Sequence, residues 1–283
     1  MRVILLLDIG NTHTHAGLAT EGRVVRQVNL PTSGWGEVKR AERLRDWVGR
    51  AAPAEVVVCS VVPGATPRGK RWVGRWWGLE VLELCWRNVR GVGIDYPRPE
   101  TIGADRLANA VAARARFGAP VLVVDFGTAV TLDVVDRRGD YVGGVIAPGL
   151  AAMTDYLHER TALLPRIRIR DVERAIGRST EEAMLIGAVH GYRGLIRELI
   201  MEVRAELGLR RVVPVVATGG YAGLMAAGLS LITVVEPNLT LDGLRIFRQA
   251  RLRGDALGDG MSGRERAGLR RATGRNRRSR RGG

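Results

Sequence analysis

The stretch VILLLDIGNT, residues 3–12, joins an apolar run of strand length to a polar loop that begins with an aspartate and a glycine. The stretch VLVVDFGT, residues 121–128, ends in the same way. An offset of 117 residues relates the two aspartates, the two loop glycines, and the turn glycines Gly22 and Gly139. Three identities at one offset, with apolar strands matched around them, indicate an internal duplication.

Strand and helix patterns alternate along the chain. Strand patterns occupy residues 3–7, 13–19, 23–29, 55–62, 79–84, 121–124, 130–136, 141–146 and 212–217. Helical patterns occupy residues 37–51, 68–77, 104–117, 149–158 and 179–207, and a further helix follows residues 218–220. This alternation predicts two α/β halves with central mixed sheets, residues 1–116 and 117–250, and a cleft between them.

The composition is that of a folded protein that stays in water. Hydrophobic residues make up 46% of the 283 residues and charged residues 26%, which excludes a chain that is disordered throughout. The longest apolar run, residues 56–62, is far shorter than the roughly 18 residues of a membrane span. The five apolar residues before Asp8 are too few for a signal peptide. We therefore expect a cytoplasmic protein without membrane contact, and Cys59 and Cys85 to be free thiols.

The positive charge is concentrated at the C-terminal end. Residues 251–283 hold eleven arginines against three acidic residues, so they contribute +8 of the net charge of +15. This segment has almost no large apolar side chain, which predicts a disordered basic tail. Such a tail could contact nucleic acid non-specifically, or it could be a solvated extension without a function.

Three loops carry the residue types that bind phosphate. In the loop of residues 8–12, glycine lets the backbone approach closely, while amides, Asn and Thr supply donors. The aspartate at its start can orient Mg²⁺ or its waters. The loops of residues 125–129 and 218–220 have the same character. Each alone could be a tight turn, but together they predict a nucleotide held in the cleft.

Asp105 and Arg106 lie at the start of the helix of residues 104–117. An aspartate in a first helical turn often serves only the helix dipole. Here it could also act as a base toward a hydroxyl group, with Arg106 binding an anionic substrate. The helix terminus is expected to lower the pKa of Asp105, which matters little for phosphoryl transfer because the loose transition state mainly requires an oriented hydroxyl.

Two other patterns imitate binding sites. The run of residues 64–70, GATPRGK, resembles a phosphate-binding loop, but Arg71 stands where Ser or Thr should reach magnesium and Pro67 lacks an amide. His13 and His15 alternate on a strand, yet no third metal ligand is near them in the sequence. We interpret neither pattern as a site.

In order and spacing, these motifs resemble those of the type III pantothenate kinases, a family of the acetate/sugar kinase, Hsp70 and actin superfamily. The matching segments are DIGNTHTHAG (8–17), SVVP (60–63), Tyr96 with GADR (103–106), DFGTAVTLD (125–133), GGVIAPG (143–149), TALLP (161–165), residues 177–187 and ATGG (217–220). The resemblance implies an actin-like ATPase fold, two duplicated ribonuclease H-like α/β domains. It also implies ATP-dependent phosphorylation of pantothenate to 4′-phosphopantothenate, the first step of coenzyme A biosynthesis.

The resemblance also implies roles for individual residues. The first ATP phosphate loop would comprise Asp8, Ile9, Gly10, Asn11, Thr12, His13, Thr14 and His15, and Thr128 would also contact ATP. Pantothenate would be bound by Tyr96, Gly103, Ala104, Asp105, Arg106 and Thr180. Asp105 would accept the proton, and Asp125 would bind a monovalent cation, K⁺ or NH₄⁺, beside ATP and Mg²⁺. A homodimer is implied, with Thr180 reaching pantothenate from the same or the partner subunit. The family commonly has an apolar residue at position 15, so a side-chain contact of His15 with ATP is an open question.

Two other functions fit parts of the pattern. The phosphate loops do not choose the acceptor, so a kinase for another small hydroxy acid is one alternative. The other is a regulator that binds nucleotide on this fold and nucleic acid through its tail. The presence of Asp8, Asp105 and Asp125 together favours an enzyme, since a binding module need not keep them.

Overall fold

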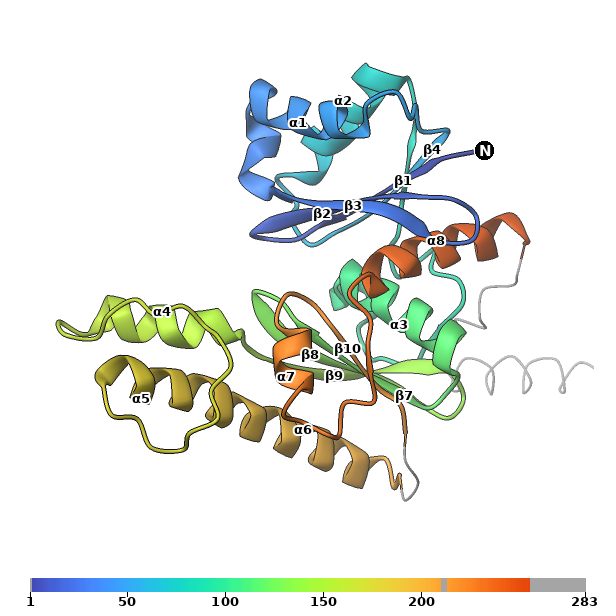
Figure 1. Ribbon diagram of the computed structural model, residues 1–283. Helices are drawn as coiled ribbons and strands as arrows, with labels where there is room; N and C mark the ends of the chain where they lie inside the picture. The colour runs from blue at the N-terminus through green and yellow to red at the C-terminus, as the bar shows by residue number, and fades with distance from the viewer. Residues whose placement is uncertain (1, 210–212, 255–283) are drawn as a thin grey trace, which may run out of the picture.

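The computed structural model describes residues 2–209 and 213–254, which form two mixed sheets with helices around and between them (Figure 1). The first sheet has the strand order β3-β2-β1-β4-β5 and the second β11-β10-β7-β8-β9-β6. The strands are β1 (Ile4–Ile9), β2 (His13–Ala19), β3 (Val24–Pro31), β4 (Glu55–Ser60), β5 (Val81–Glu83), β6 (Gly93–Ile94), β7 (Val121–Phe126), β8 (Ala129–Val135), β9 (Asp140–Pro148), β10 (Val215–Thr218) and β11 (Val234–Val235). The helices are η1 (Thr32–Gly36), α1 (Val38–Val48), α2 (Thr66–Trp77), η2 (Pro99–Thr101), α3 (Ala104–Phe117), α4 (Leu150–Arg160), α5 (Thr180–Ile186), η3 (Gly187–Gly191), α6 (Tyr192–Glu206), α7 (Ala222–Ala226) and α8 (Leu239–Leu252).

The internal duplication is visible in the sheets. Strands β1, β2 and β3 form an antiparallel meander, with β4 parallel to β1, and β7, β8, β9 and β10 repeat this arrangement. The burial pattern is also the same in β1 and β7 and in β2 and β8. However, Ile9 pairs with Thr14 whereas Phe126 pairs with Val130, so the first hairpin loop is one residue longer. The offset is therefore 116 between the second strands, and Thr12 corresponds to Thr128.

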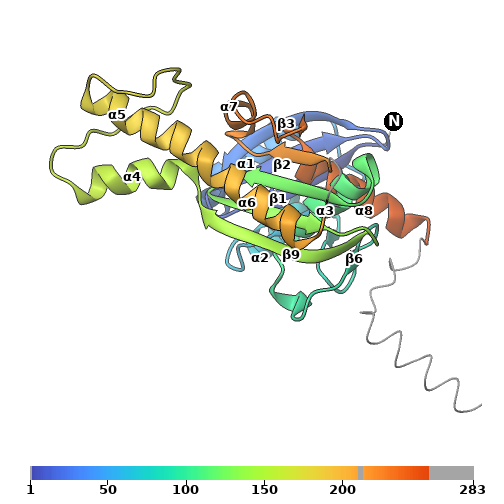
Figure 2. The ribbon, with the colours of Figure 1, turned by 90° about the horizontal axis from the view of Figure 1, so that it is seen from below.

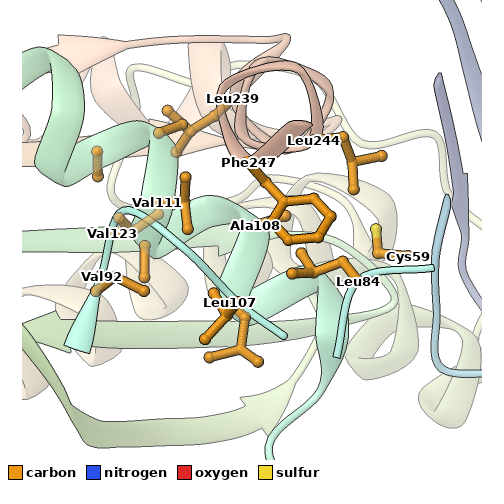
Figure 3. Close-up of a cluster of buried hydrophobic side chains, with 14 of the residues drawn as sticks. Cys59, Leu84, Val92, Leu107, Ala108, Val111, Val123, Leu239, Leu244 and Phe247 are labelled. Atoms are coloured by element: carbon orange, nitrogen blue, oxygen red, sulfur yellow. The ribbon is translucent and has the colours of Figure 1, made fainter. Parts of the chain in front are cut away.

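Both faces of each sheet are covered, which explains why the central strands are apolar at nearly every position. Residues at successive positions of β1 point to opposite faces. Leu5 and Leu7 pack in the cluster with α1 and α2, and Ile4 and Leu6 pack in the cluster that contains α3 and α8. The second sheet packs against α6 and α7 on its outer face. Helices α3 and α8 therefore lie between the two sheets, where Leu107, Val111, Leu244 and Phe247 meet (Figure 3).

The two halves exchange elements. Strand β6, from the N-terminal half, pairs with β9 of the second sheet. Helix α8, from the C-terminal half, packs against β1, β2 and β4. Its buried Arg248 binds both carboxylate oxygens of Glu55 at 2.6 and 2.7 Å and donates to Glu21 at 2.6 Å. The division at residue 116 therefore stays a prediction, because each half supplies an element to the other.

Helices α4 and α5 project away from the sheets together with the segment between them (Figures 1 and 2). We call residues 149–186 the arm. The helix predicted over residues 179–207 is present as α5 and α6, joined by the wide turn η3. The arm and the adjacent strand β9 expose six large apolar side chains: Ile146, Met153, Tyr156, Leu157, Leu163 and Ile176.

Two predicted elements have other boundaries than expected, and the run of residues 64–70 is not a phosphate-binding loop. Helix α8 continues to Leu252, so the first residues of the predicted tail are helical, and residues 255–283 lie outside the described residues. The strand predicted from residue 212 begins at Val215, with residue 212 outside the described part. The phosphate-loop imitation of residues 64–70 enters helix α2, and Lys70 forms an ion pair with Glu83. None of the helices among the described residues is long and apolar enough to cross a membrane.

Candidate active site

Three aspartates meet where the two halves face each other. Asp8 lies near the end of β1, Asp125 near the end of β7, and Asp105 in the first turn of α3. Burial, together with the negative charges of Asp105 and Asp125, raises the pKa of Asp8 to about 8. Because charges act on one another strongly only at short range, the three carboxylates share one neighbourhood. The fold thus brings the two repeat aspartates close together, while the cleft between the halves stays a prediction.

Asp8 and Asp125 each accept a hydrogen bond from a neighbouring side chain. The thiol of Cys59 on β4 donates to Asp8 Oδ1 at 3.4 Å. Asn109 on α3 donates from Nδ2 to Asp125 Oδ2 at 3.0 Å. Burial raises the pKa of Asp125 to about 7, although the bond from Asn109 acts in the opposite direction. Among the described residues, no positive side chain stabilises the charge of either carboxylate.

The first two phosphate loops touch. The hydroxyl groups of Thr12 and Thr128 lie 3.1 Å apart, and both side chains are exposed. Each loop is closed by the same bond, from the amide of Gly10 to the carbonyl of His13 at 3.0 Å and from that of Gly127 to Ala129 at 3.1 Å. The tips of the two hairpins, which are exposed and contain glycine, therefore lie next to each other.

The third loop closes over Asp125. Gly219 has a φ of +88°, a conformation that favours glycine. A Cβ atom there would lie 2.6 Å from Asp125 Oδ1 and 2.7 Å from the carbonyl of Phe126. The backbone after β10 therefore approaches the second phosphate loop closely. The three loops chosen from the sequence are brought together in the fold.

A buried chain of hydrogen bonds supports the first loop from below. Trp35 donates from Nε1 to Thr14 Oγ1 at 2.8 Å, Thr14 and Thr32 share a bond of 3.1 Å, and Thr32 donates to the carbonyl of Gly10 at 2.6 Å. The side chains of Thr14 and Ile9 are fully buried on the outer face of the sheet. Strand alternation turns these two side chains away from Asp8, so any contact of Ile9 and Thr14 with ATP would be made by their backbone, and their place in the ATP loop stays a prediction. Their backbone and the exposed tip, Asn11–His13, stay available.

His15 lies opposite Asp8 in the register of β1 and β2, so the two side chains share a face. Its Nε2 atom is 2.9 Å from Gln27 Oε1. Burial lowers the pKa of His15, which favours the neutral ring. A neutral imidazole adds no positive charge next to Asp8.

Asp105 is positioned by the turn before α3. Its Oδ1 accepts a bond of 2.8 Å from the amide of Arg106. A Cβ at Gly103 would lie 2.5 Å from Asp105 Oδ1, so a larger residue there would displace the carboxylate. Burial raises the pKa of Asp105, and the charge of Arg106 only partly opposes this effect. The backbone amides at the start of α3 lower this pKa, as the sequence predicts, but burial outweighs them.

The side chain of Arg106 belongs to a cluster of polar residues that includes Asp133 on β8 and Tyr141 on β9. Its Nε donates to Asp133 Oδ1 at 2.6 Å, and Tyr141 donates to the same oxygen at 3.1 Å. Tyr96 packs edge-on against Tyr141, with 6.2 Å between ring centroids. The buried Nη2 atom of Arg106 has no hydrogen-bond partner among the described residues. An unpartnered guanidinium N–H on the residue that follows Asp105 fits an anionic group of a substrate.

The carboxylate oxygens of the three aspartates are ligands of the kind that hard cations prefer. Across residues 2–209 and 213–254, no cluster of three His, Cys, Asp or Glu side chains could hold a metal ion alone. A cation would thus take its other ligands from phosphate, water or backbone carbonyls, as Mg²⁺ does in nucleotide sites. The raised pKa values of Asp8 and Asp125 fit a site that gains a cation with its ligand.

Comparison with known proteins places this site in a family. The type III pantothenate kinase model matches residues 4–202. Type III pantothenate kinase from Akkermansia muciniphila is 49% identical over 243 residues, covering 86% of this chain and 96% of the relative. The enzyme from Methylacidiphilum infernorum is 42% identical over 246 residues, with coverages of 86% and 87%. This chain belongs to the type III pantothenate kinase family.

Solved structures confirm the predicted fold. Ethanolamine utilization protein EutJ from Carboxydothermus hydrogenoformans has a TM-score of 0.52 at 15% identity, covering 87% of this chain and 90% of its own. The activator of 2-hydroxyisocaproyl-CoA dehydratase from Clostridium difficile, with bound ADPNP, has a TM-score of 0.51 at 13% identity, with coverages of 89% and 97%. At these identities the likeness establishes the fold alone. The actin-like ATPase fold with two α/β halves is thus confirmed for this family member.

Thr180 is the one predicted site residue that the single chain holds apart from the others. It is exposed at the start of α5, after the cap residue Ser179, whose hydroxyl accepts from the amide of Glu182 at 3.2 Å. Both views show α5 on the projecting arm, away from α3 (Figures 1 and 2). Within one subunit, Thr180 is therefore not near Asp105.

Four polar residues of the site escaped the sequence analysis: Cys59, Asn109, Asp133 and Thr240. Asp133 is fully buried in an apolar strand, and the pKa of its carboxyl is about 6 because burial outweighs Arg106. A charged residue at a core position of a strand needs a buried partner. That conflict in β8 was the available signal, although the partner could not be named from it.

The raised pKa of Asp8 predicts how this family member responds to pH. Between pH 3.8 and about 8, the folded form holds a proton that the unfolded form has lost, so the free energy of unfolding falls as the pH rises through this window. Asp8→Asn removes the carboxyl group that titrates, so the free energy of unfolding of this variant should not fall for that reason. We expect the unliganded variant to melt roughly 2–4 °C above the natural protein at pH 9, a shift that corresponds to about 1 kcal/mol. The exposed Asp46→Asn is the matched control. Parallel melting profiles of all three proteins from pH 6 to 9 would contradict the assignment.

Proposed function

We propose that this chain transfers the γ-phosphoryl group of ATP to the primary hydroxyl of pantothenate, producing 4′-phosphopantothenate and ADP in the first step of coenzyme A biosynthesis. The observation that carries the proposal is the meeting of Asp8, Asp105 and Asp125 beside two touching phosphate loops. Family membership over residues 4–202 supplies the acceptor. The cytoplasm, where ATP is available, is the compartment we propose for it.

One group of residues would bind ATP and its cations. The exposed tips of the two hairpins, with Asn11, Thr12 and Thr128, would bind the phosphates of ATP. Asp8 would hold Mg²⁺ or its waters, and Mg²⁺ when bound would neutralise charge on the β- and γ-phosphates. Asp125 would hold the monovalent cation. The carbonyl-rich turns around Gly127 and Gly219 support a role for this region in binding a weakly hydrated ion.

On the acceptor side, Asp105 would orient the hydroxyl group and accept its proton as the phosphoryl group transfers. The raised pKa of Asp105 brings it closer to neutral pH, where a proton acceptor works best. Arg106, with its unpartnered Nη2, would bind the carboxylate of pantothenate. Tyr96, Gly103 and Ala104 would form the wall next to it.

One coupled assay tests the reaction. ADP release is measured with MgATP alone, with pantothenate, and with other small hydroxy acids such as pantoate and glycerate. We expect release only with pantothenate. Release with another acid but not with pantothenate would favour the kinase alternative, and nucleotide binding without release would favour a regulator.

We infer that the active form is a homodimer joined through the arm. Six exposed apolar side chains gather on the arm and β9, and such patches mark interaction surfaces. Thr180 lies on the same arm, away from Asp105 of its own chain. A partner subunit that contributes Thr180 would complete the pantothenate site.

Mixing two inactive variants tests this arrangement. If Thr180 acts across the interface, a mixed dimer of Asp105→Asn and Thr180→Ala subunits contains one intact site. Co-expressed and purified as a heterodimer, it should recover roughly half of the natural activity per dimer. A heterodimer as inactive as its two parents would place Thr180 in the site of its own subunit or outside any site.

The basic tail is not expected to take part. Helix α8 ends at Leu252, so the truncation begins after Gly254. Without residues 255–283, melting temperature and pantothenate phosphorylation should stay nearly unchanged, while any retention on nucleic acid should be lost. That retention should also weaken steeply with salt in the full chain. A truncated protein that no longer folds or turns over would show that these residues belong to the enzyme.

A further inference from the structure

Helix α3 carries two site residues one turn apart. Asp105 and Asn109 are separated by four positions, which places them on the same face of the helix. Asp105 faces the cluster with Asp8, and Asn109 donates from Nδ2 to Asp125 Oδ2 at 3.0 Å. The same helical face thus presents the proposed proton acceptor and a donor to the proposed cation ligand.

The orientation of the Asn109 amide is set from helix α8. Thr240 donates from Oγ1 to Asn109 Oδ1 at 2.8 Å, and both side chains are buried. Because its oxygen accepts this bond, the amide must point its nitrogen toward Asp125. A hydroxyl group 131 residues away in the sequence therefore fixes which group of Asn109 meets the carboxylate.

Close contact of the two helices makes this bond possible. Gly243 lies one turn after Thr240 on α8, and a Cβ at this position would overlap the carbonyl of Ala108. Ala108 is the neighbour of Asn109 on α3. Glycine at the crossing brings α8 near enough for the short side chain of Thr240 to reach the amide. Helix α8 also packs against β1, the strand that carries Asp8.

We propose that Asn109 is a positioning residue that orients the Asp125 carboxylate for binding of nucleotide and its monovalent cation, and that Thr240 fixes Asn109 in the required orientation. The proposal rests on the proposed role of Asp125. It adds that the chain Thr240–Asn109–Asp125 joins α8, α3 and β7, so that packing of the helices between the sheets determines the direction of the carboxylate. Neither Asn109 nor Thr240 needs to touch the substrates.

Binding provides a readout that does not depend on turnover. The melting temperature of each variant is measured alone and with a non-hydrolysable MgATP analogue in KCl or LiCl, and the nucleotide concentration for half-maximal stabilisation is compared. Asn109→Leu, similar in volume, should raise this concentration by about tenfold or more, the factor expected for a lost hydrogen bond to a charged group. Thr240→Val should raise it by roughly threefold, and Thr240→Ser, which keeps the hydroxyl, should restore the natural value. Thr154→Val is the matched control, since Thr154 is a buried threonine that bonds only to its own helix.

Two further comparisons separate positioning from a general loss of stability. If Asn109 acts through Asp125, the effects of Asn109→Leu and Asp125→Ala on nucleotide binding should not add in the double variant. Additive effects, or folded Asn109→Leu and Thr240→Val proteins that bind nucleotide like the natural protein, would overturn the proposal. A natural protein that is stabilised equally in KCl and LiCl would instead remove the cation from the proposed function. In that case nucleotide binding by Asn109→Leu still decides the role of Asn109.

Discussion

Asp105→Asn is expected to lower kcat by about 10²–10⁴-fold, the usual effect of removing a general base. Asparagine keeps the size of the side chain and can still accept the bond from the amide of Arg106. It cannot accept the hydroxyl proton. Nucleotide binding should change little, because the hydrogen bond of Asp105 goes to the amide of Arg106 and not to either phosphate loop. Steady-state kinetics and nucleotide-dependent melting of the same purified variant measure both effects.

The competing explanation is that Asp105 serves only the start of α3. In that case Asp105→Asn should cost under about 1 kcal/mol of stability and leave turnover near normal. Asp242 offers a matched control, since it also lies in the first helical turn, of α8, where it pairs with Arg116 and Arg245. Asp242→Asn should lower the melting temperature without a large change in kcat. If the Asp105 variant behaves like the Asp242 variant, Asp105 is not the proton acceptor.

Local patterns in the sequence were sufficient to predict the repeated hairpins. The apolar runs of β1 and β7, each ending at Asp and Gly, predicted two equivalent strands, each followed by an equivalent loop. The fold confirms this, and the contact between Thr12 and Thr128 follows from it. These features depend on short-range periodicity and on loop chemistry, both of which can be read from adjacent residues.

Long-range polar pairs could not be predicted in this way. Asn109 and Thr240 each interrupt an apolar helix face, which marks them as buried polar groups that need partners. Their separation of 131 residues leaves the partner undetermined, because an amphipathic helix does not specify which sheet it covers. Helix α8 in fact covers the first sheet although it follows the second. The network that orients Asp125 depends on that crossing.

A matched family motif does not distinguish contacts made by side chains from contacts made by the backbone. The run of residues 8–15 was assigned to ATP as a block. Strand alternation places the side chains of Ile9 and Thr14 in the outer core, where Thr14 bonds to Trp35 instead. Their role is to hold the loop from below. A motif identifies a segment, and the period of the strand decides which of its side chains face the ligand.

Asp125→Ala is expected to remove both most of the activity and the preference for potassium. In the natural protein, rates should be similar in potassium and ammonium, which have similar radii, and should fall in sodium and lithium. Loss of one electrostatic contact to the reacting phosphates typically costs about 10²–10³-fold in rate, and we expect this range for Asp125→Ala. The remaining rate should be the same in all four salts, because the residue that selects the cation is gone.

Asp8→Ala separates this role of Asp125 from a general need for negative charge. Both aspartates are half-buried, and burial raises the pKa of each. If Asp8 serves Mg²⁺ and Asp125 the monovalent ion, Asp8→Ala should weaken stabilisation by the MgATP analogue yet keep the difference between KCl and LiCl. Asp125→Ala should lose that difference while it retains part of the response to magnesium. Equal rates of the natural protein in potassium, ammonium, sodium and lithium would remove the cation site, and Asp125 would then act on the phosphate loop alone.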